Sequence, residues 1–380
     1  MKLAKNKIFY WSPSLVNIAT NKAVINSAHG INIFSKKYAA YIVNFFGEFS
    51  DPKFEADKKK IKLINHFNKK LIKLLPKYGK IKSRISFMII FIFSFLPLKN
   101  LIKKQEPEYL IIHLITSLPL VLLIIFNFKT KFILRISGFP KMNFLRKLLW
   151  KIASKKIYKV TCPSAGTYNY LKNLNIITND KIHILYDPVI NVKEVIKKRK
   201  EKKVEYENYF LAVGRLTKQK DFSFLCKALK DKILVNKDIK LLIAGEGEEK
   251  NKLIKYVNNN NLQKNIIFLD HIDNIFPYFY NAKAFILSSM WEDPGFVLIE
   301  AGFNRTLVLS NDSEPGPKEI IENNFNGVVY KKKEIESFHD KFDQILKDTN
   351  NKNLIYNNLK NVKKFTIFNH FKSLEKILSI

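Results

Sequence analysis

A chain of 380 residues is long for one domain and comfortable for two. Apolar residues make up 47% of the sequence, which is enough for hydrophobic cores. The two cysteines, Cys162 and Cys226, have neither CxxC nor metal-type spacing, so we expect a reduced, cytoplasmic setting and no cysteine metal site. The first residues, MKLAKNKIFYWSP, lack the apolar segment of a signal peptide, and we expect none.

The positive charge is concentrated in the first half of the chain. Residues 1–200 carry 38 basic and 9 acidic side chains, whereas residues 201–380 carry 28 and 24. A genomic bias toward lysine would be expected in both halves, so the asymmetry indicates a polyanionic partner of the first half. That half has no recognisable nucleic-acid-binding motif. We therefore expect an anionic membrane surface as a partner and no nucleic acid.

Short apolar runs alternate with stretches of helical length along the whole chain. The strand candidates are KIFYW, AAYIVNFF, EYLIIHLI, KFILRIS, KIYKVTCPS and HILYDP in the first half, and YFLAVG, IKLLIAG, NIIFLD, AFILSS, TLVLS and GVVY in the second. Continuous runs of Val, Ile and Leu separated by helical lengths are typical of parallel sheets covered on both faces. Two such sets predict an α/β protein with two Rossmann-like domains.

Two segments of the first half are apolar enough to be considered as membrane spans. The run over 85–98 (ISFMIIFIFSFLPL) is too short to cross a bilayer. The run over 110–128 contains polar residues and a proline, which divide it into a strand and a helix beginning near Ser117. We therefore expect neither segment to span a membrane.

The segment 58–104 combines many lysines with apolar residues at helical spacing. Its apolar positions include Ile61, Ile64, Leu71 and Leu75. This pattern is typical of an interfacial helix and predicts that the first domain docks on an anionic membrane. The alternative is that the apolar face packs on the domain's own sheet and that the lysines are merely solvated.

The alternation of elements also predicts the domain boundaries. We expect a first domain over residues 1–188 and a charged linker over 189–207, which contains KEVIKKRKEKKVE. A second domain should occupy residues 208–358. The C-terminal helix, over 359–380, should cross back to the first domain.

Glycine and polar residues follow several of the predicted strands, where open α/β sheets bind their ligands. In the second half these positions hold Gly214, Arg215, Gly245, His271 and Glu292, and in the first half His113. So many such strand ends in one domain predict a nucleotide-binding cleft. A lone histidine at a strand end is more often structural, and both interpretations of His113 remain open.

The loop GRLTKQKDF brings two cations to the end of one predicted strand. Gly214 lets the backbone turn tightly, Arg215 offers a planar fork to phosphate oxygens, and Lys220 offers a mobile point charge. Two fixed cations facing a cleft would stabilise a diphosphate leaving group. The alternative is a solvated basic loop.

The stretch over residues 290–302, MWEDPGFVLIEAG, contains two glutamates eight residues apart. Asp293 is a suitable N-cap and Pro294 a suitable first helical residue, so we expect a helix over 294–303. Glu292 would then lie at a strand-to-helix turn, favoured by the helix dipole, and Glu300 could be a half-buried residue facing solvent. That structural explanation and a functional one are both open for the pair alone.

The motifs VGRLTKQKDF, AGEGEE, SSMWEDPGFVLIEAG and GPKEIIENNFNGVVY, in this order and spacing, resemble the donor domain of retaining GT-B glycosyltransferases of family 4, the glycosyl transferases group 1. They cover about residues 209–330. The first half is similar mainly in layout, through SPSLVNIATNKAVINSAHG, LIIHLITS and ILRISGFP. The resemblance implies two Rossmann-like domains facing across a cleft, with the nucleotide sugar on the second and the acceptor on the first.

The resemblance also implies roles for single residues. Arg215 and Lys220 would bind the donor diphosphate and stabilise its charge as it leaves. Glu292 would accept hydrogen bonds from the transferred sugar and Glu300 from the ribose, while His113 would lie on the acceptor side with a catalytic role. The remaining donor-binding positions would be Gly214, Gly245, His271, Gly295 and Phe296.

The sequence departs from the family pattern in two places. EDPG stands where the family usually has an EGFG-like motif, which leaves the donor sugar open. Residues 17–20 (NIAT) replace the glycine-rich loop after the first strand, which leaves phosphate contacts from the first domain open. The chain also has no Asp-x-Asp triplet. We therefore expect metal-free chemistry and no cofactor beyond a nucleoside-diphosphate sugar as co-substrate.

Together these observations predict a glycosyltransferase on the inner face of the cytoplasmic membrane, bound peripherally. It would move a hexose or N-acetylhexosamine, with retention, to a lipid-linked, lipopolysaccharide or polysaccharide acceptor. One alternative is a GT-B sugar-nucleotide epimerase, which needs no acceptor. Another is a non-enzymatic basic protein that binds polyanions or membranes; the joint presence of the two cations and two glutamates named above argues against it.

Overall fold

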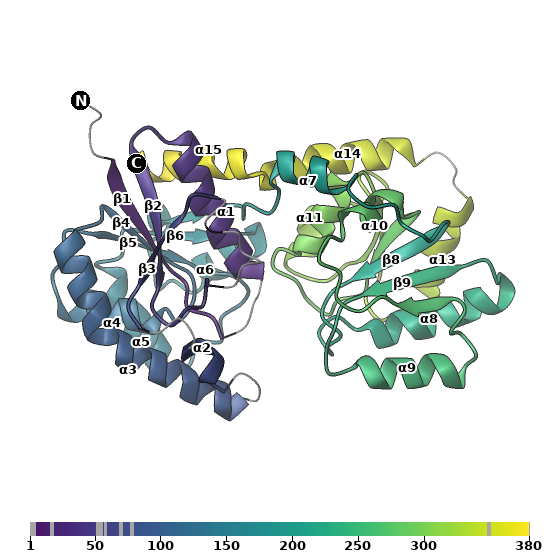
Figure 1. The fold of residues 1–380 in the computed structure, drawn as a ribbon, viewed down its shortest axis with the longest axis horizontal. Helices are drawn as coiled ribbons and strands as arrows, with labels where there is room; N and C mark the ends of the chain where they lie inside the picture. The colour runs from purple at the N-terminus through teal and green to yellow at the C-terminus, as the bar shows by residue number, and fades with distance from the viewer. Residues whose placement is uncertain are drawn as a thin grey trace. The chain divides into compact units, whose positions relative to one another are not determined.

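The computed structural model describes residues 5–15, 19–50, 56, 59–67, 71–76, 80–347 and 351–379. The chain divides into two compact units, Met1–Pro188 with Ile367–Ile380, and Val189–Thr366. Each unit contains one parallel sheet flanked by helices (Figure 1). The predicted α/β fold with two Rossmann-like domains is confirmed.

The sheet of the first unit has seven strands in the order β3-β2-β1-β4-β5-β6-β7. The strands are β1 (Asn6–Trp11), β2 (Tyr38–Asn44), β3 (Lys62–Asn65), β4 (Tyr109–Ile112), β5 (Lys131–Arg135), β6 (Lys159–Cys162) and β7 (Ile182–Ile184). Every neighbouring pair is parallel. The chain builds outward to one side from β1 and to the other from β4. The boundary between β1 and β4 is therefore a topological switch point, where such sheets bind ligands.

Helices cover both faces of this first sheet, because its strands are apolar on both faces. They are α1 (Ala19–Phe34), α2 (Leu71–Leu74), α3 (Lys80–Gln105), α4 (Ser117–Ile125), α5 (Phe144–Ser154), α6 (Ala165–Asn173) and α15 (Ile367–Ser379). Tyr10 shares one core with residues of α1 and α15. Trp11, the next residue of β1, shares another core with residues of α3, α4 and α5. Side chains of successive strand residues point to opposite faces, so these helices form two layers.

The C-terminal helix α15 is joined to the first unit by a buried chain of hydrogen bonds. His370 Nδ1 lies 2.6 Å from the carbonyl oxygen of Tyr186, and Nε2 lies 2.7 Å from Ser27 Oγ, which is 2.6 Å from the Tyr10 hydroxyl. Because a carbonyl only accepts, Nδ1 carries the proton and Nε2 accepts from Ser27. Burial lowers the pKa of His370 to about 4, which keeps the ring neutral in this arrangement.

The sheet of the second unit has six strands in the order β10-β9-β8-β11-β12-β13. The strands are β8 (Tyr209–Val213), β9 (Lys240–Ala244), β10 (Ile266–Phe268), β11 (Ala284–Leu287), β12 (Leu307–Asn311) and β13 (Val328–Tyr330). All neighbouring pairs are again parallel. The switch point of this sheet lies between β8 and β11. Every strand candidate from the sequence is found in one of the two sheets.

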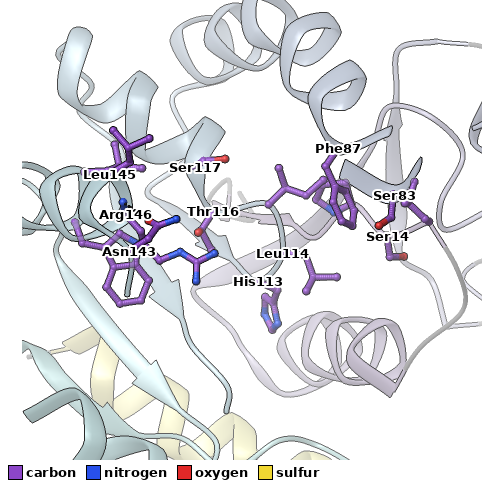
Figure 2. A pocket seen from close by; sticks show the side chains of 15 residues that line it. Ser14, Ser83, Phe87, His113, Leu114, Thr116, Ser117, Asn143, Leu145 and Arg146 are labelled. Carbon is purple, nitrogen blue, oxygen red and sulfur yellow. Dashed lines mark hydrogen bonds between the residues drawn. The ribbon is translucent and has the colours of Figure 1, made fainter. Parts of the chain in front are cut away.

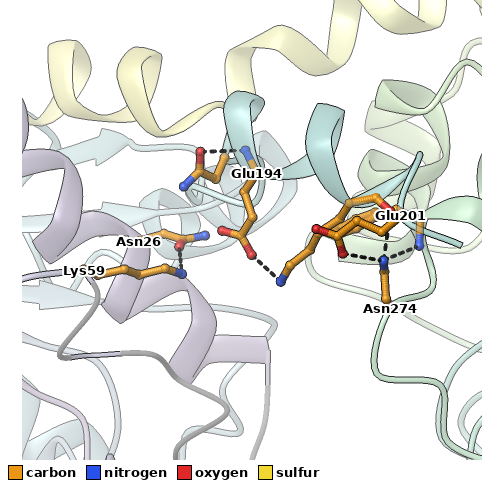
Figure 3. A network of polar contacts seen from close by, with 8 residues as sticks. Asn26, Lys59, Glu194, Glu201 and Asn274 are labelled. Atoms are coloured by element: carbon orange, nitrogen blue, oxygen red, sulfur yellow. Dashed lines mark hydrogen bonds and ion pairs between the residues drawn. The ribbon is translucent and has the colours of Figure 1, made fainter.

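The second unit contains eight α-helices within its described residues. They are α7 (Val192–Lys198), α8 (Phe222–Val235), α9 (Lys250–Asn259), α10 (Phe276–Asn281), α11 (Phe296–Phe303), α12 (Gly316–Ile320), α13 (Ile335–Lys347) and α14 (Lys352–Val362). Residues 189–207, the expected linker, include α7 and are part of this unit. Asn274 Nδ2 donates to the Lys198 carbonyl at 2.9 Å and to Glu201 Oε2 at 3.4 Å, which anchors the end of α7 (Figure 3). The single C-terminal helix expected over 359–380 is wrong: α14 ends at Val362 within the second unit, and the chain returns to the first unit with α15 at Ile367.

The helical apolar face predicted for the segment 58–104 is wrong in the first part of that segment. Part of this segment lies outside the described residues, but Ile64 is in strand β3 and Ile61 is 4% exposed. Leu71 and Leu75 pack against the core of the first unit. These apolar side chains therefore pack on the sheet, as the alternative interpretation held.

Exposed apolar surface is found instead on α3. Along this helix Ile85, Met88, Ile92, Phe93 and Leu96 are 49–63% exposed. Residues Lys82–Gln105 are long and apolar enough to cross a membrane by length and composition, and 28% of the most apolar window is buried. The sequence argument from a short apolar run therefore does not hold, because the helix extends well beyond that run. The opposite side of α3 packs on the first unit through its core residues.

Candidate active site

Two of the charged residues predicted for the donor site meet at the switch point of the second sheet. Lys220 lies on the loop after β8 and Glu292 on the loop after β11, and their side chains form an ion pair. Both are largely buried, with 12% and 10% of the side chain exposed. Ser289 donates a hydrogen bond of 2.7 Å to the same carboxylate. A carboxylate and an ammonium group are thus held where ligands of α/β sheets bind.

Hydrogen bonds join the two loops that carry this pair. Ser288 Oγ donates to the Lys220 carbonyl at 2.8 Å, and the Met290 N–H donates to the Gln219 carbonyl at 2.7 Å. Gln219 Nε2 donates to the Trp291 carbonyl at 3.0 Å. Because these contacts run through the backbone, Lys220 and Glu292 are positioned by the loops as well as by their mutual attraction.

Glycines allow the neighbouring loops to approach closely. A Cβ atom on Gly245, at the end of β9, would lie 1.9 Å from the Gly214 carbonyl oxygen. A Cβ on Gly214 would lie 3.1 Å from Lys220 Cε, so the lysine side chain passes directly over this glycine. A residue with a side chain at position 245 would therefore push the two loops apart.

The helix after Glu292 begins later than the sequence predicted. Its N-cap is Gly295, with φ +100° in the left-handed region, and the first helical residue is Phe296. Asp293 is therefore not the N-cap, and Pro294 lies outside the helix. The left-handed turn that glycine permits replaces the expected capping by a side chain. Helix α11 therefore starts directly after the Glu292 loop.

Glu300 lies on α11 and is 8% exposed, as is Glu292. The structural alternative, in which Glu300 is half-buried and faces solvent, is therefore wrong. Glu292 is fixed further by its backbone, since its carbonyl accepts a hydrogen bond of 3.0 Å from the Gly316 N–H. A Cβ on Gly316 would lie 1.9 Å from the Pro294 carbonyl oxygen. Only glycine therefore lets the start of α12 pack this closely on the Glu292 loop.

The other predicted donor residues lie at neighbouring strand ends. Arg215 is exposed on the loop after β8. His271 follows β10 and lies 3.2 Å from Asp273, and Lys250 pairs with Glu246 at 3.1 Å and with Asp270. Within the described ranges, no hydrogen bond or ion pair joins Arg215 or His271 to the Lys220–Glu292 pair, and no group of three or more His, Cys, Asp or Glu side chains could hold a metal ion.

His113 lies in the first unit, at the switch point of its sheet. Its N–H donates to the Trp11 carbonyl at 2.9 Å, and its side chain lines a pocket of about 730 Å³ (Figure 2). Burial, with the positive charge of Arg135 and the nearby His370, lowers the pKa of His113 well below its usual range. The imidazole is therefore neutral near pH 7 and can donate or accept a hydrogen bond at the pocket. Of the residues 17–20, Asn17 and Ile18 lie outside the described residues, and Ala19 and Thr20 begin α1.

The structure adds residues that the sequence analysis missed. Ser289 donates a hydrogen bond to the Glu292 carboxylate, and Gln219 joins the Lys220 loop to the Glu292 loop. Gly316 lets the start of α12 pack closely on the Glu292 loop. All three stand inside or beside the quoted motifs SSMWEDPGFVLIEAG, VGRLTKQKDF and GPKEIIENNFNGVVY. The sequence shows polar residues and a glycine at these positions, which could have marked them as candidates. Their hydrogen-bond and packing partners lie on other loops, so the contacts follow only from the fold.

Comparisons with known proteins find similarity to glycosyltransferases. Residues 193–362 match the family model described as glycosyl transferases group 1. An uncharacterized glycosyltransferase of Methanocaldococcus jannaschii is 29% identical over 317 residues, which cover 77% of this chain and 73% of that protein. A Campylobacter jejuni enzyme named N-acetylgalactosamine-N,N'-diacetylbacillosaminyl-diphospho-undecaprenol 4-alpha-N-acetylgalactosaminyltransferase is 24% identical over 212 residues, 54% of this chain and 57% of that enzyme.

The fold is also shared with solved structures. The crystal structure of a glycosyltransferase from Rickettsia africae ESF-5 superimposes with a TM-score of 0.76 at 18% identity, covering 99% of this chain and 98% of that one. The matched family model lies wholly within the second unit, which carries the Lys220–Glu292 pair. The protein is an enzyme, a glycosyltransferase of GT-B fold, and its second unit is similar to the glycosyl transferases group 1.

Proposed function

We propose that this glycosyltransferase transfers a hexose or N-acetylhexosamine from a nucleoside-diphosphate sugar to a lipid-linked, lipopolysaccharide or polysaccharide acceptor, with retention and without a metal ion. The observation that carries the donor part is the Lys220–Glu292 pair at the switch point of the second sheet. The acceptor class is supported by the diphospho-undecaprenol named for the Campylobacter jejuni relative.

The proposed donor site uses the residues around this pair. The diphosphate takes Lys220 and the nearby Arg215 as cationic partners, while Glu292 accepts from hydroxyls of the sugar and Glu300 from the ribose. Gly214, Gly245 and His271 line the strand ends beside the nucleotide, and the N–H groups at Gly295 and Phe296 face the donor. Donor binding would then exchange the Lys220–Glu292 contact for two contacts with the substrate, so neither charge is left buried without a partner.

The proposed reaction keeps the configuration at the anomeric carbon. The bond between that carbon and the diphosphate oxygen breaks, a bond to the acceptor hydroxyl oxygen forms on the same face, and the acceptor proton passes to the leaving diphosphate. Lys220 and Arg215 stabilise the charge that develops on the diphosphate. His113, neutral at the pocket of the first unit, is the candidate for orienting the acceptor hydroxyl on that side.

The charge and exposed apolar surface of the first unit support a peripheral position on the inner face of the cytoplasmic membrane. The helix α3 presents an apolar face, and neither residues 58–105 nor residues 109–179 contain an acidic residue. Basic side chains near an anionic leaflet contribute about 1 kcal/mol each. This arrangement would bring a lipid-linked acceptor to the enzyme in the plane of the bilayer.

The function is tested by incubating the enzyme with UDP-, GDP-, ADP- and dTDP-sugars and with lipid-linked and lipopolysaccharide acceptors, and detecting products by mass spectrometry. We expect one donor and one acceptor class to give a product with an α-linkage from an α-linked donor by NMR. Activity should be unchanged by excess EDTA. A β-linked product would overturn retention, and loss of activity that Mn²⁺ or Mg²⁺ restores would overturn metal independence.

A further inference from the structure

The pocket of about 730 Å³ in the first unit lies beside the switch point between β1 and β4. Its volume is within the range of small-molecule sites, and its position is where α/β sheets bind ligands. In Figure 2, Asn143, Leu145 and Arg146 lie on one side, Ser14, Ser83 and Phe87 on the other, with His113 and Leu114 between them. The walls therefore come from α3, α5 and the loops after β1 and β4.

The polar groups of this pocket favour an anion. Arg146 lines it from the first turn of α5, and its Nη1 donates to the Lys141 carbonyl at 2.8 Å. This bond holds the guanidinium in place and leaves further N–H groups for a ligand. Thr116 lines the pocket at the start of α4, and its side chain makes no capping hydrogen bond. Among the described residues no carboxylate lines this pocket.

The rim of the same pocket is apolar and continues onto exposed surface. Phe87, on α3, lines the pocket and is 40% exposed. Leu145, on α5, lines the pocket and is 75% exposed, and the neighbouring Phe144 is 79% exposed. Two further residues of α5, Leu148 and Ile152, continue this apolar row at helical spacing. Such a surface next to a pocket is typical of a binding site for an apolar or membrane-borne partner.

An anion-binding pocket with an apolar rim on a basic surface fits one ligand class. We propose that this pocket binds the diphosphate headgroup of a lipid that carries the acceptor, with Arg146 on a phosphate and the lipid chain leaving past Leu145 and Phe87 along α3 and α5. This inference rests on the proposed function and names the part of the acceptor that the first unit holds. A free soluble diphosphate would use the same cation but not the apolar rim.

Isothermal titration calorimetry with geranylgeranyl diphosphate, without any donor sugar, tests this site. The wild-type protein should bind it at least tenfold more tightly than either inorganic diphosphate or geranylgeraniol. Arg146→Gln should weaken binding by about ten- to a hundredfold, the usual effect of losing a charge-assisted hydrogen bond. Leu145→Ser should also weaken it, because the lipid chain loses apolar contact. Both side chains are exposed, so the variants should fold.

Two matched variants serve as controls. Lys147→Gln removes an exposed cation on α5, and Leu234→Ser removes an exposed leucine on α8 of the second unit. Neither residue lines the pocket. Both should bind geranylgeranyl diphosphate within twofold of wild type. The proposal would be overturned if Arg146→Gln bound the lipid as tightly as the wild type, or if the controls were weakened as much as the test variants. It would also be overturned if inorganic diphosphate bound as tightly as the lipid. Donor binding measured on Arg146→Gln should be unchanged, so failure of the lipid site is distinguishable from failure of the proposed transferase function.

Discussion

The ammonium group of Lys220 pairs with the carboxylate of Glu292 between the loops that follow β8 and β11. These two strands flank the switch point of the second sheet, and the pair joins oppositely charged side chains across this point. Both charges are largely buried, so each depends on the other while no substrate is bound.

This dependence predicts strong coupling between the two residues. Lys220→Met should lower the free energy of unfolding by about 3 kcal/mol, because it leaves a buried carboxylate without its cation. The double variant Lys220→Met/Glu292→Gln should recover part of that loss. Urea unfolding of the wild type, both single variants and the double variant measures the coupling. Additive effects would show that the pair does not act as a unit in solution.

Glu300→Gln should weaken nucleotide-sugar binding with little effect on stability. The carboxylate lies on the buried side of α11, and the amide cannot accept hydrogen bonds from two ribose hydroxyls in the same way. We expect about a tenfold higher dissociation constant by calorimetry. Glu336→Gln, at an exposed position of α13, is the control and should bind as the wild type does. If both variants bind alike, Glu300 does not contact the nucleotide.

The apolar face of α3 predicts binding to anionic membranes. The wild type should float with vesicles that contain phosphatidylglycerol and be released as salt rises. Phe93→Glu, on the exposed face, should reduce the bound fraction by tenfold or more, because burial of a Phe side chain contributes about 1.5–3 kcal/mol. Phe325→Glu, at a similarly exposed Phe of the second unit, should leave binding unchanged. Equal recovery with neutral vesicles would contradict this account.

The buried His370 predicts acid sensitivity of the first unit. Its pKa is about 4 in the folded state and about 6.5 when unfolded, so the unfolded state takes up the proton first as pH falls. The contribution of the neutral ring is complete above pH 6.5 and decreases toward pH 4, by up to roughly 3 kcal/mol.

Urea unfolding between pH 7.5 and 4.5 measures this effect, with His370→Gln as the comparison. The stability of the variant should fall less steeply with decreasing pH than that of the wild type. The difference between the two proteins is needed because burial raises the pKa of Glu48 to about 7, which acts in the opposite direction over part of this range. Parallel pH profiles would show that the pKa of His370 is the same in the folded and unfolded states, which would contradict this account.

The strands were predictable because their signal is local. Each is a short run of Val, Ile, Leu and aromatic residues, and a buried parallel strand needs nothing else. The strand β3 was missed because KLIN is short and lies among lysines, where the apolar positions also fit a helix. Its assignment as a strand depends on pairing with β2, which is a contact between distant residues.

The site was predictable as a set of residue types but not as a set of contacts. Arg215, Lys220, Glu292 and Glu300 could be named from their motifs, whereas the Lys220–Glu292 pair could not. The start of α11 was misplaced, because Asp293 and Pro294 are good helix starters and the left-handed Gly295 takes over that role only in the folded loop. Gly316 shows the same limit, since its need for a small residue arises from the Pro294 carbonyl.

The central claim, that the second unit binds a nucleoside-diphosphate sugar through the loops around Lys220 and Glu292, is tested most directly by calorimetry with UDP-, GDP-, ADP- and dTDP-sugars. The account predicts that at least one binds the wild type, and that Arg215→Ala and Lys220→Ala each weaken binding about tenfold or more through loss of a phosphate contact. The exposed Lys218→Ala, on the same loop, should bind as the wild type does. The account would be contradicted if none of the four nucleotide sugars bound the wild type. It would also be contradicted if Arg215→Ala and Lys220→Ala bound the donor as tightly as Lys218→Ala does.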